Sequence, residues 1–245
     1  SEVSLDRTAQ MPIATPWDSR KWDSLKWDSP TWDSLRWDSL RWDSLRLERP
    51  TEHLLVVHLD GTARLPASRV VESLAQVLAQ AEHRLDCRVV ILAGTSSVLV
   101  DPPDPEARES VAQQLQRLIL GCKLPVIGAF GTDVRDLGWF SAQCCDASIH
   151  DLRAVYCAEQ LGSTQALASM AAMLFARRYG DEVAKEILFT GAEYSGTDLQ
   201  RRLGGLRVAE PDQQHVDAIR LATDWSKRTR ESLIRWKQSR TQALR

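Results

Sequence analysis

The sequence lacks a basic excess, a long apolar run and a basic-then-apolar start. Its 245 residues carry 31 Lys and Arg against 33 Asp and Glu, a formal net charge of −2. General nucleic-acid binding needs a basic excess to displace counterions, so this class is not expected. No apolar run approaches the roughly 18 residues of a membrane span, and the start SEVSLDRTAQ does not resemble a signal peptide. We therefore expect a cytoplasmic protein that contacts neither nucleic acid nor a membrane.

Cysteine is scarce, and its spacing supports neither a disulfide framework nor a zinc site. The five cysteines form no CxxC pair, and no histidine stands at a spacing typical of zinc ligands. An odd number of cysteines favours free thiols in a reducing compartment, and we expect no metal. With 43% hydrophobic and 26% charged residues, the remaining composition is that of a globular protein.

Aromatic residues make up only 7% of the chain, yet it holds nine tryptophans, and six of them lie in one short segment. The W-D-S motif recurs there every five residues, at Trp17, Trp22, Trp27, Trp32, Trp37 and Trp42. Five residues turn a helix by about 500°, and an odd period alternates between strand faces, so neither element aligns the tryptophans. Segment 1–50 is therefore predicted to be a weakly ordered tail. Three roles stay open: a functionless polyampholyte, a docking tail in which residues 17–46 bind a protein partner, or an element packed on the body.

Residues 51–245 form the predicted body, in which short apolar runs alternate with segments of helical periodicity. The expected strands are 53–59, 88–93 and 124–130, followed by a short extended segment at 147–149. The expected helices are 67–82, 105–120, one that ends near residue 145, 166–179, 181–188, 196–203 and 212–242. Strands that alternate with helices, followed by helices alone, predict an α/β fold with a mostly parallel sheet.

Four segments of the body resemble the crotonase (enoyl-CoA hydratase/isomerase) superfamily in order and spacing. CRVVILAG at 87–94 is similar to a family strand and its closing glycine, and CKLPVIGAFG at 122–131 to the strand before the oxyanion turn. FSAQCCDASI at 140–149 resembles a helix that ends in a Cys-Asp pair, and the run 176–208 resembles the family's segment around its Thr-Gly pair. The resemblance implies a crotonase-like ββα superhelix with a C-terminal helical trimerisation region, preceded by the low-complexity WDS repeat tail.

The resemblance also implies a chemistry. Members of this family bind acyl thioesters of coenzyme A or acyl carrier protein, and two backbone N–H groups stabilise the enolate that forms. Coenzyme A or phosphopantetheine would then carry the substrate, and no further cofactor is implied. A homotrimer or hexamer is expected. An active protein would be a lyase or isomerase of the enoyl-CoA hydratase type, with a place in secondary-metabolite biosynthesis as one possibility.

The presumed site departs from the family pattern at both oxyanion donors. The first donor would be the N–H of Val100 or Asp101, in a stretch without glycine whose prolines lack an N–H. The second would be the N–H of Leu137, in a turn that keeps Gly138 alone of the family's three glycines. Because replaced glycines restrict the backbone, this turn is the weakest part of the resemblance.

The catalytic glutamates of the hydratases are not both kept. The first aligns with Phe140, which cannot move a proton, and the second with Ala158 or Glu159. Glu159 is thus the first candidate for acid–base work, with an exposed structural carboxylate as the alternative. Asp136 and Asp133 are second-rank candidates. Dehydration, isomerisation or decarboxylation with one carboxylate is favoured over hydration with two, and an inactive protein is also possible.

Four further expectations complete the interpretation. The alternative function is a catalytically impaired scaffold or activating subunit that docks partners through the WDS repeat. A peptidase with Ser169 as nucleophile ranks third, because the next histidine in sequence, His215, lies on the last helix. Asp146 is expected to make structural hydrogen bonds, and Trp225 and Trp236 are expected to share one face of a single C-terminal helix.

Overall fold

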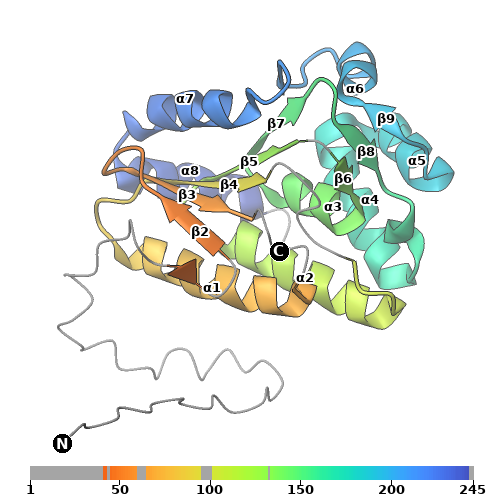
Figure 1. Ribbon diagram of the computed structural model, residues 1–245, viewed down its shortest axis with the longest axis horizontal. Coiled ribbons are helices and arrows are strands. Elements are labelled where there is room, and N and C mark those ends of the chain that lie inside the picture. Colours follow the sequence, from red (N-terminus) through yellow and green to blue (C-terminus); the bar gives the residue numbers. More distant parts are fainter. Residues whose placement is uncertain (1–40, 43–44, 60–64, 95–100, 132, 243–245) are drawn as a thin grey trace, which may run out of the picture. The chain divides into compact units, whose positions relative to one another are not determined.

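A computed structural model of the protein describes residues 41–42, 45–59, 65–94, 101–131 and 133–242 (Figure 1). A seven-stranded sheet forms the centre, in the order β1-β2-β3-β4-β5-β7-β10. These strands are Arg41–Trp42, Leu45–Glu48, Leu54–His58, Val89–Gly94, Val126–Phe130, Ala147–Asp151 and Val208–Ala209. β3, β4, β5, β7 and β10 run parallel, whereas β1 and β2 add an antiparallel edge. The continuous apolar runs of β3, β4 and β5 suit parallel strands that are buried on both faces.

Helices cover both faces of this sheet (Figure 1). On one face, α1 (Ala67–His83), α2 (Pro105–Gly121) and α3 (Asp136–Cys144) pack against side chains such as Val57 and Leu92. On the other face, α7 (Gln214–Ser226) and α8 (Arg230–Thr241) enclose a smaller cluster with Val56 and Ile91. Neighbouring residues of one strand thus enter opposite cores, as the two-residue period of a strand requires.

A second, three-stranded sheet stands beside the end of the first and consists of β6 (Asp133–Arg135), β8 (Val155–Cys157) and β9 (Tyr194–Ser195). Helices α4 (Gln165–Tyr179), α5 (Asp181–Thr190) and α6 (Gly196–Arg202) and the 3₁₀ turn Gln160–Gly162 belong to the same region. The sequence did not predict this sheet, because strands of two or three residues are too short to show a period.

The predicted strands and helices are otherwise confirmed, with one correction at the C-terminus. The expected helix 212–242 is two helices, because α7 ends at Ser226 and α8 starts at Arg230. Thr229 caps the second helix by accepting a hydrogen bond from the Ser232 N–H (3.3 Å). Trp225 and Trp236 therefore lie on different helices, and their rings meet edge-on across the break with centroids 5.4 Å apart.

The body's sheet begins within the segment 1–50 that the sequence assigned to the tail. β1 and β2 form a hairpin in which Trp42 pairs with Leu45, and Arg46 then pairs with His58 of β3. Leu45 and Leu47 are buried in the core. Residues 45–48 thus belong to the sheet of the body, whereas the first five repeat tryptophans lie outside the described residues. The docking role of residues 17–46 stays a prediction.

The described part of the chain contains no helix with the length and apolar character needed to cross a bilayer.

Helix α2 begins with a capping arrangement that also positions the candidate site. The Asp104 carboxylate accepts a hydrogen bond from the Ala107 N–H (2.8 Å), and Pro105 occupies the first helical position. We expect Asp104→Ala to lower the free energy of unfolding by about 1 kcal/mol in urea titration. Asp104→Asn keeps an acceptor, so its free energy of unfolding should stay within a few tenths of a kcal/mol of that of the unchanged protein. An equal loss in both variants would contradict this role for the cap.

Candidate active site

The structure brings predicted site residues together beyond the carboxyl ends of β4 and β5. Asp101 precedes helix α2, and Asp136 and Leu137 form the first turn of α3. The Leu137 N–H donates a hydrogen bond to Asp101 Oδ1 (3.3 Å), and the Gln160 N–H donates to Asp136 Oδ1 (2.7 Å). In parallel α/β sheets, this edge is where ligands bind. Val100, the other candidate for the first donor, lies outside the described residues.

The turn before α3 reaches its backbone angles without the missing glycines. Asp136 takes a φ of 37°, in the left-handed region that aspartate tolerates better than most residues. The following N–H, on Leu137, is one of the first N–H groups of a helix and has no partner within the helix. It points instead at the Asp101 carboxyl group. A carboxyl oxygen therefore accepts from this N–H, and the role of Leu137 as the second oxyanion donor stays a prediction.

Asp101 and Asp136 form an acidic pair that is largely shielded from water. The Asp101 side chain is 19% exposed, and Asp136 is buried. Burial, together with the charge of Asp136, raises the pKa of Asp101 to about 7, and burial also raises the pKa of Asp136. Near neutral pH, Asp101 thus exchanges readily between its acid and its base form, which suits general acid–base chemistry.

Arg108 completes the site, although it was not predicted from the sequence. Its Nε lies 3.8 Å from Asp101 Oδ1, and its other nitrogens donate to Ser163 Oγ (2.9 Å) and the Pro102 carbonyl (2.8 Å). The residue is buried, and its Nε has no hydrogen-bond partner among the described residues. Its position on the apolar face of α2, at helical spacing from Val111, was the signal that could have identified it.

Comparison with known proteins identifies the architecture. No family model and no curated protein matches the chain. Among solved structures, an enoyl-CoA hydratase from Bacillus anthracis has a TM-score of 0.70 at 17% identity, covering 81% of this chain and 82% of that one. An enzyme of a dehydratase/decarboxylase couple involved in polyketide beta-branching has a TM-score of 0.69 at 21% identity, covering 82% and 86%. The ECH2 decarboxylase domain of CurF from Lyngbya majuscula has the same values.

The chain has the crotonase fold. The resemblance inferred from the sequence is confirmed at this level, because identities this low show the fold alone. The Leu137 N–H, which donates to Asp101, lies in the segment for which the resemblance predicts an oxyanion donor. The C-terminal trimerisation region and the oxyanion hole itself stay predictions.

The two positions aligned with the hydratase glutamates differ in burial. Phe140 is fully buried beside Trp139, so the first position is part of the apolar core. Glu159 is exposed, at the start of the 3₁₀ turn whose Gln160 N–H binds Asp136. Its negative charge raises the pKa of Asp136 slightly further after the larger effect of burial. Glu159 stays a prediction, as does Gly138, which lies buried in the first turn of α3.

The remaining candidates have other partners. Asp133 is half-exposed and pairs with Arg135 (2.8 Å), and Ser169 is exposed and donates to the Gln165 carbonyl within its own helix (2.9 Å). Asp146 accepts a hydrogen bond from the Val126 N–H (2.8 Å), so its expected structural hydrogen bond is confirmed.

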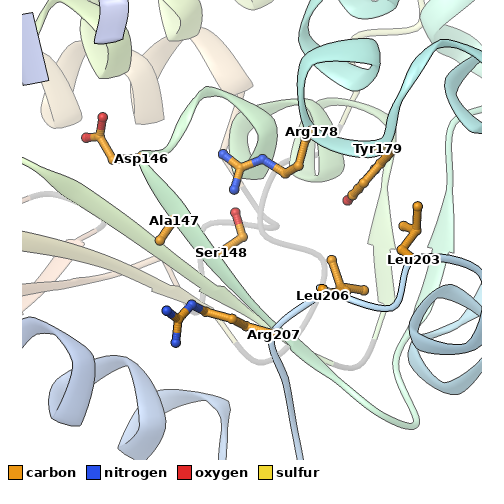
Figure 2. A pocket seen from close by; sticks show the side chains of 9 residues that line it. Asp146, Ala147, Ser148, Arg178, Tyr179, Leu203, Leu206 and Arg207 are labelled. Atoms are coloured by element: carbon orange, nitrogen blue, oxygen red, sulfur yellow. The ribbon is translucent and has the colours of Figure 1, made fainter. Parts of the chain in front are cut away.

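A cavity of about 400 Å³ lies at the other end of β7 and shares no residue with the acidic pair (Figure 2). Ser148, Tyr179 and the two arginines Arg178 and Arg207 line it, among others. Arg178 is already engaged, because its guanidinium donates to the carbonyls of Gln143 and Cys145. The acidic pair and not this cavity therefore marks the candidate active site.

Proposed function

We propose that the protein is a divergent member of the crotonase superfamily that processes acyl thioesters, with Asp101 as its acid–base group. The observation that carries the proposal is the hydrogen bond from the Leu137 N–H to Asp101 Oδ1. It places a carboxyl group of raised pKa directly at a helix-start N–H group, within a fold shared with an enoyl-CoA hydratase and a decarboxylase. The substrate would be carried by coenzyme A or by the phosphopantetheine of an acyl carrier protein, with no further cofactor.

The geometry suggests how the site works. A thioester carbonyl oxygen takes the place of Asp101 Oδ1 on the Leu137 N–H, and that N–H stabilises the negative charge of the enolate. The displaced Asp101 carboxyl stays beside the reacting carbons, where it removes or returns a proton. Arg108 balances the charge of the two carboxyl groups. The first donor N–H is that of Val100 or Asp101, as the resemblance implies.

Phe140 limits the reactions that this site performs. Hydration in this family uses two glutamates, and here an apolar, fully buried ring stands at one of these positions. A reaction that needs one carboxyl group, namely dehydration, isomerisation or decarboxylation, fits the site better. The similarity to an enzyme of a polyketide beta-branching couple favours a biosynthetic substrate. We place the protein in the cytoplasm, as a homotrimer or hexamer, with acyl-CoA or acyl carrier protein as its partner.

A second candidate function is a catalytically impaired scaffold or activating subunit that docks partners through the WDS repeat. Two observations favour it: the buried ring of Phe140 and the occupation of the predicted donor by Asp101. A scaffold has no need of an open donor, whereas an enzyme must displace Asp101 before its substrate binds.

Calorimetric binding of a short enoyl-CoA to the full-length protein separates the two functions. For the enzyme, we expect micromolar binding, tightened several-fold in Asp101→Ala because the Leu137 N–H no longer has to be vacated. Glu193→Gln is the matched control, since it removes an exposed carboxylate that pairs with Arg135 nearby and should leave the affinity unchanged.

Absence of binding by a folded protein, for the enoyl-CoA and for the same acyl group on a carrier protein, would refute the enzyme and leave the scaffold. Binding that Asp101→Ala does not change would refute the assignment of Leu137 as the donor.

A further inference from the structure

Three potential metal ligands from distant parts of the sequence meet at one edge of the large sheet. Glu48 ends β2, His58 ends β3 and His215 is the second residue of α7. One ligand atom of each lies within 4.8 Å of the other two. His58 Nε2 is 2.8 Å from Glu48 Oε2, and the two imidazole rings have centroids 5.2 Å apart. This group was not predicted from the sequence, because the two histidines are far apart in the chain.

The burial of the cluster needs an explanation beyond packing. His58 is 6% exposed, and His215 Nδ1 is buried without a hydrogen-bond partner among the described residues. A buried polar nitrogen without a partner costs about 1–3 kcal/mol and is rare in native proteins.

We propose that Glu48, His58 and His215 bind a divalent first-row transition-metal ion of the Zn²⁺ type. Two imidazole nitrogens and one carboxylate oxygen form a set that zinc accepts, with a fourth position left for water. Calcium and magnesium prefer sets of oxygen ligands, so this cluster selects against them. Zinc bonds of about 2.0–2.2 Å bring ligand atoms to about 3.3 Å from one another, which requires a modest closure of the cluster.

The partly exposed side of the cluster allows this closure. The Glu48 side chain is 41% exposed, so it can shift without disturbing the core, and an ion can enter from its side. The bound ion would join β2, which begins within the last WDS repeat unit, to α7 and so fasten the antiparallel edge of the sheet. None of the three residues belongs to the acidic pair, so the metal site is independent of the acyl-thioester proposal.

Isothermal titration of the full-length protein with ZnCl₂, in a phosphine reductant, tests the site. We expect one ion per chain with micromolar or tighter affinity, and a rise in melting temperature with zinc concentration. His215→Ala and Glu48→Gln should each weaken binding at least tenfold. His83→Ala is the matched control, because it removes an exposed histidine elsewhere and should leave the affinity unchanged.

Co²⁺ gives a second readout, since intense visible absorption bands in the wild-type protein and their loss in His215→Ala would place the ion at this imidazole. We do not expect cysteine thiols to produce the cobalt absorption bands. Cys87 and Cys122 are buried, and burial raises the pKa of each thiol to about 12. No zinc uptake, or an uptake that His215→Ala and Glu48→Gln leave unchanged, would overturn the proposal.

Discussion

Lys237→Ala is expected to lower the free energy of unfolding by about 3–5 kcal/mol, because it leaves a charge buried without its partner. The side chains of Lys237 and Asp146 are 1% and 2% exposed, and Lys237 Nζ lies 3.0 Å from Asp146 Oδ2. The same ammonium donates to the carbonyls of Ile119 (2.8 Å) and Leu124 (2.9 Å). All three donor positions of the lysine are thus used, and α8 is joined to the ends of α2 and α3.

The partner and a surface pair provide the controls. Asp146→Ala should cost a similar amount, since it strands the ammonium and also removes the acceptor of the Val126 N–H. The double variant should lose less than the sum of the two single losses, because no unpaired charge stays behind. Lys227→Ala breaks the exposed pair with Asp224 and should change the stability by less than about 0.5 kcal/mol.

Urea titrations at one fixed protein concentration measure these differences, since an oligomer makes stability depend on concentration. A loss in Lys237→Ala as small as that in Lys227→Ala would show that the buried pair does not hold α8 in place.

Long elements could be predicted from the sequence, and short or composite ones could not. Val89–Gly94 is a continuous apolar run, and the apolar residues of Ala67–His83 recur at helical spacing over 17 residues. Patterns of this length identify a strand and a helix from the sequence. The break between α7 and α8 depends on a single capping threonine, Thr229, within a segment that otherwise favours helix. Local propensity alone does not identify such a break.

The candidate site could likewise be predicted from the sequence only in part. The resemblance indicated Val100 or Asp101 in one segment and the turn with Asp136 in another, where counting back from Asp146 gave Leu137. It did not reveal that the Asp101 side chain would occupy the Leu137 N–H, since that contact depends on how two loops fold together. Arg108 was missed for a related reason, because its partners come from the loop before α2 and from the region after β8.

The cluster of Glu48, His58 and His215 could not be predicted from the sequence either, because tertiary contacts form it. The antiparallel pairing of β2 with β3 places Glu48 close to His58, and α7 returns over that edge late in the chain with His215. Residues that meet in this way have no characteristic spacing in the sequence. A search for metal motifs therefore cannot detect them, whereas the structure can.

Asp101→Asn is expected to make the protein more stable at pH 8 and to abolish most of its turnover. The pKa of Asp101 is about 7 in the folded protein and 3.8 in a solvated chain, so the folded state binds this proton more tightly. The contribution of Asp101 to stability is complete below about pH 4, falls as the pH rises towards 7 and is lost above it. Asparagine carries no charge and keeps an acceptor for the Leu137 N–H, so it avoids this loss.

This difference between the two pKa values corresponds to a loss of up to about 4 kcal/mol of stability above pH 7. We therefore expect Asp101→Asn to exceed the wild-type stability by up to this amount at pH 8 and to match it within about 1 kcal/mol at pH 4. Glu210→Gln, at an exposed carboxylate, should follow the wild type at both pH values. An equal loss of stability in Asp101→Asn at pH 4 and pH 8 would show that the folded protein holds Asp101 ionised.

Asp101→Asn also tests whether Asp101 transfers the proton in the reaction. If Asp101 moves the proton, Asp101→Asn should lower kcat for a short enoyl-CoA about 10²–10⁴-fold and remove the wild-type dependence on a group with a pKa near 7. Glu159→Gln distinguishes the other candidate, because a loss there and not in Asp101→Asn would assign the proton transfer to Glu159. A buried carboxyl group that lowers stability at neutral pH has no use in a purely structural role. Gain of stability together with loss of turnover would therefore mark Asp101 as a residue kept for catalysis, whereas gain of stability in a protein that never binds a thioester would favour the scaffold.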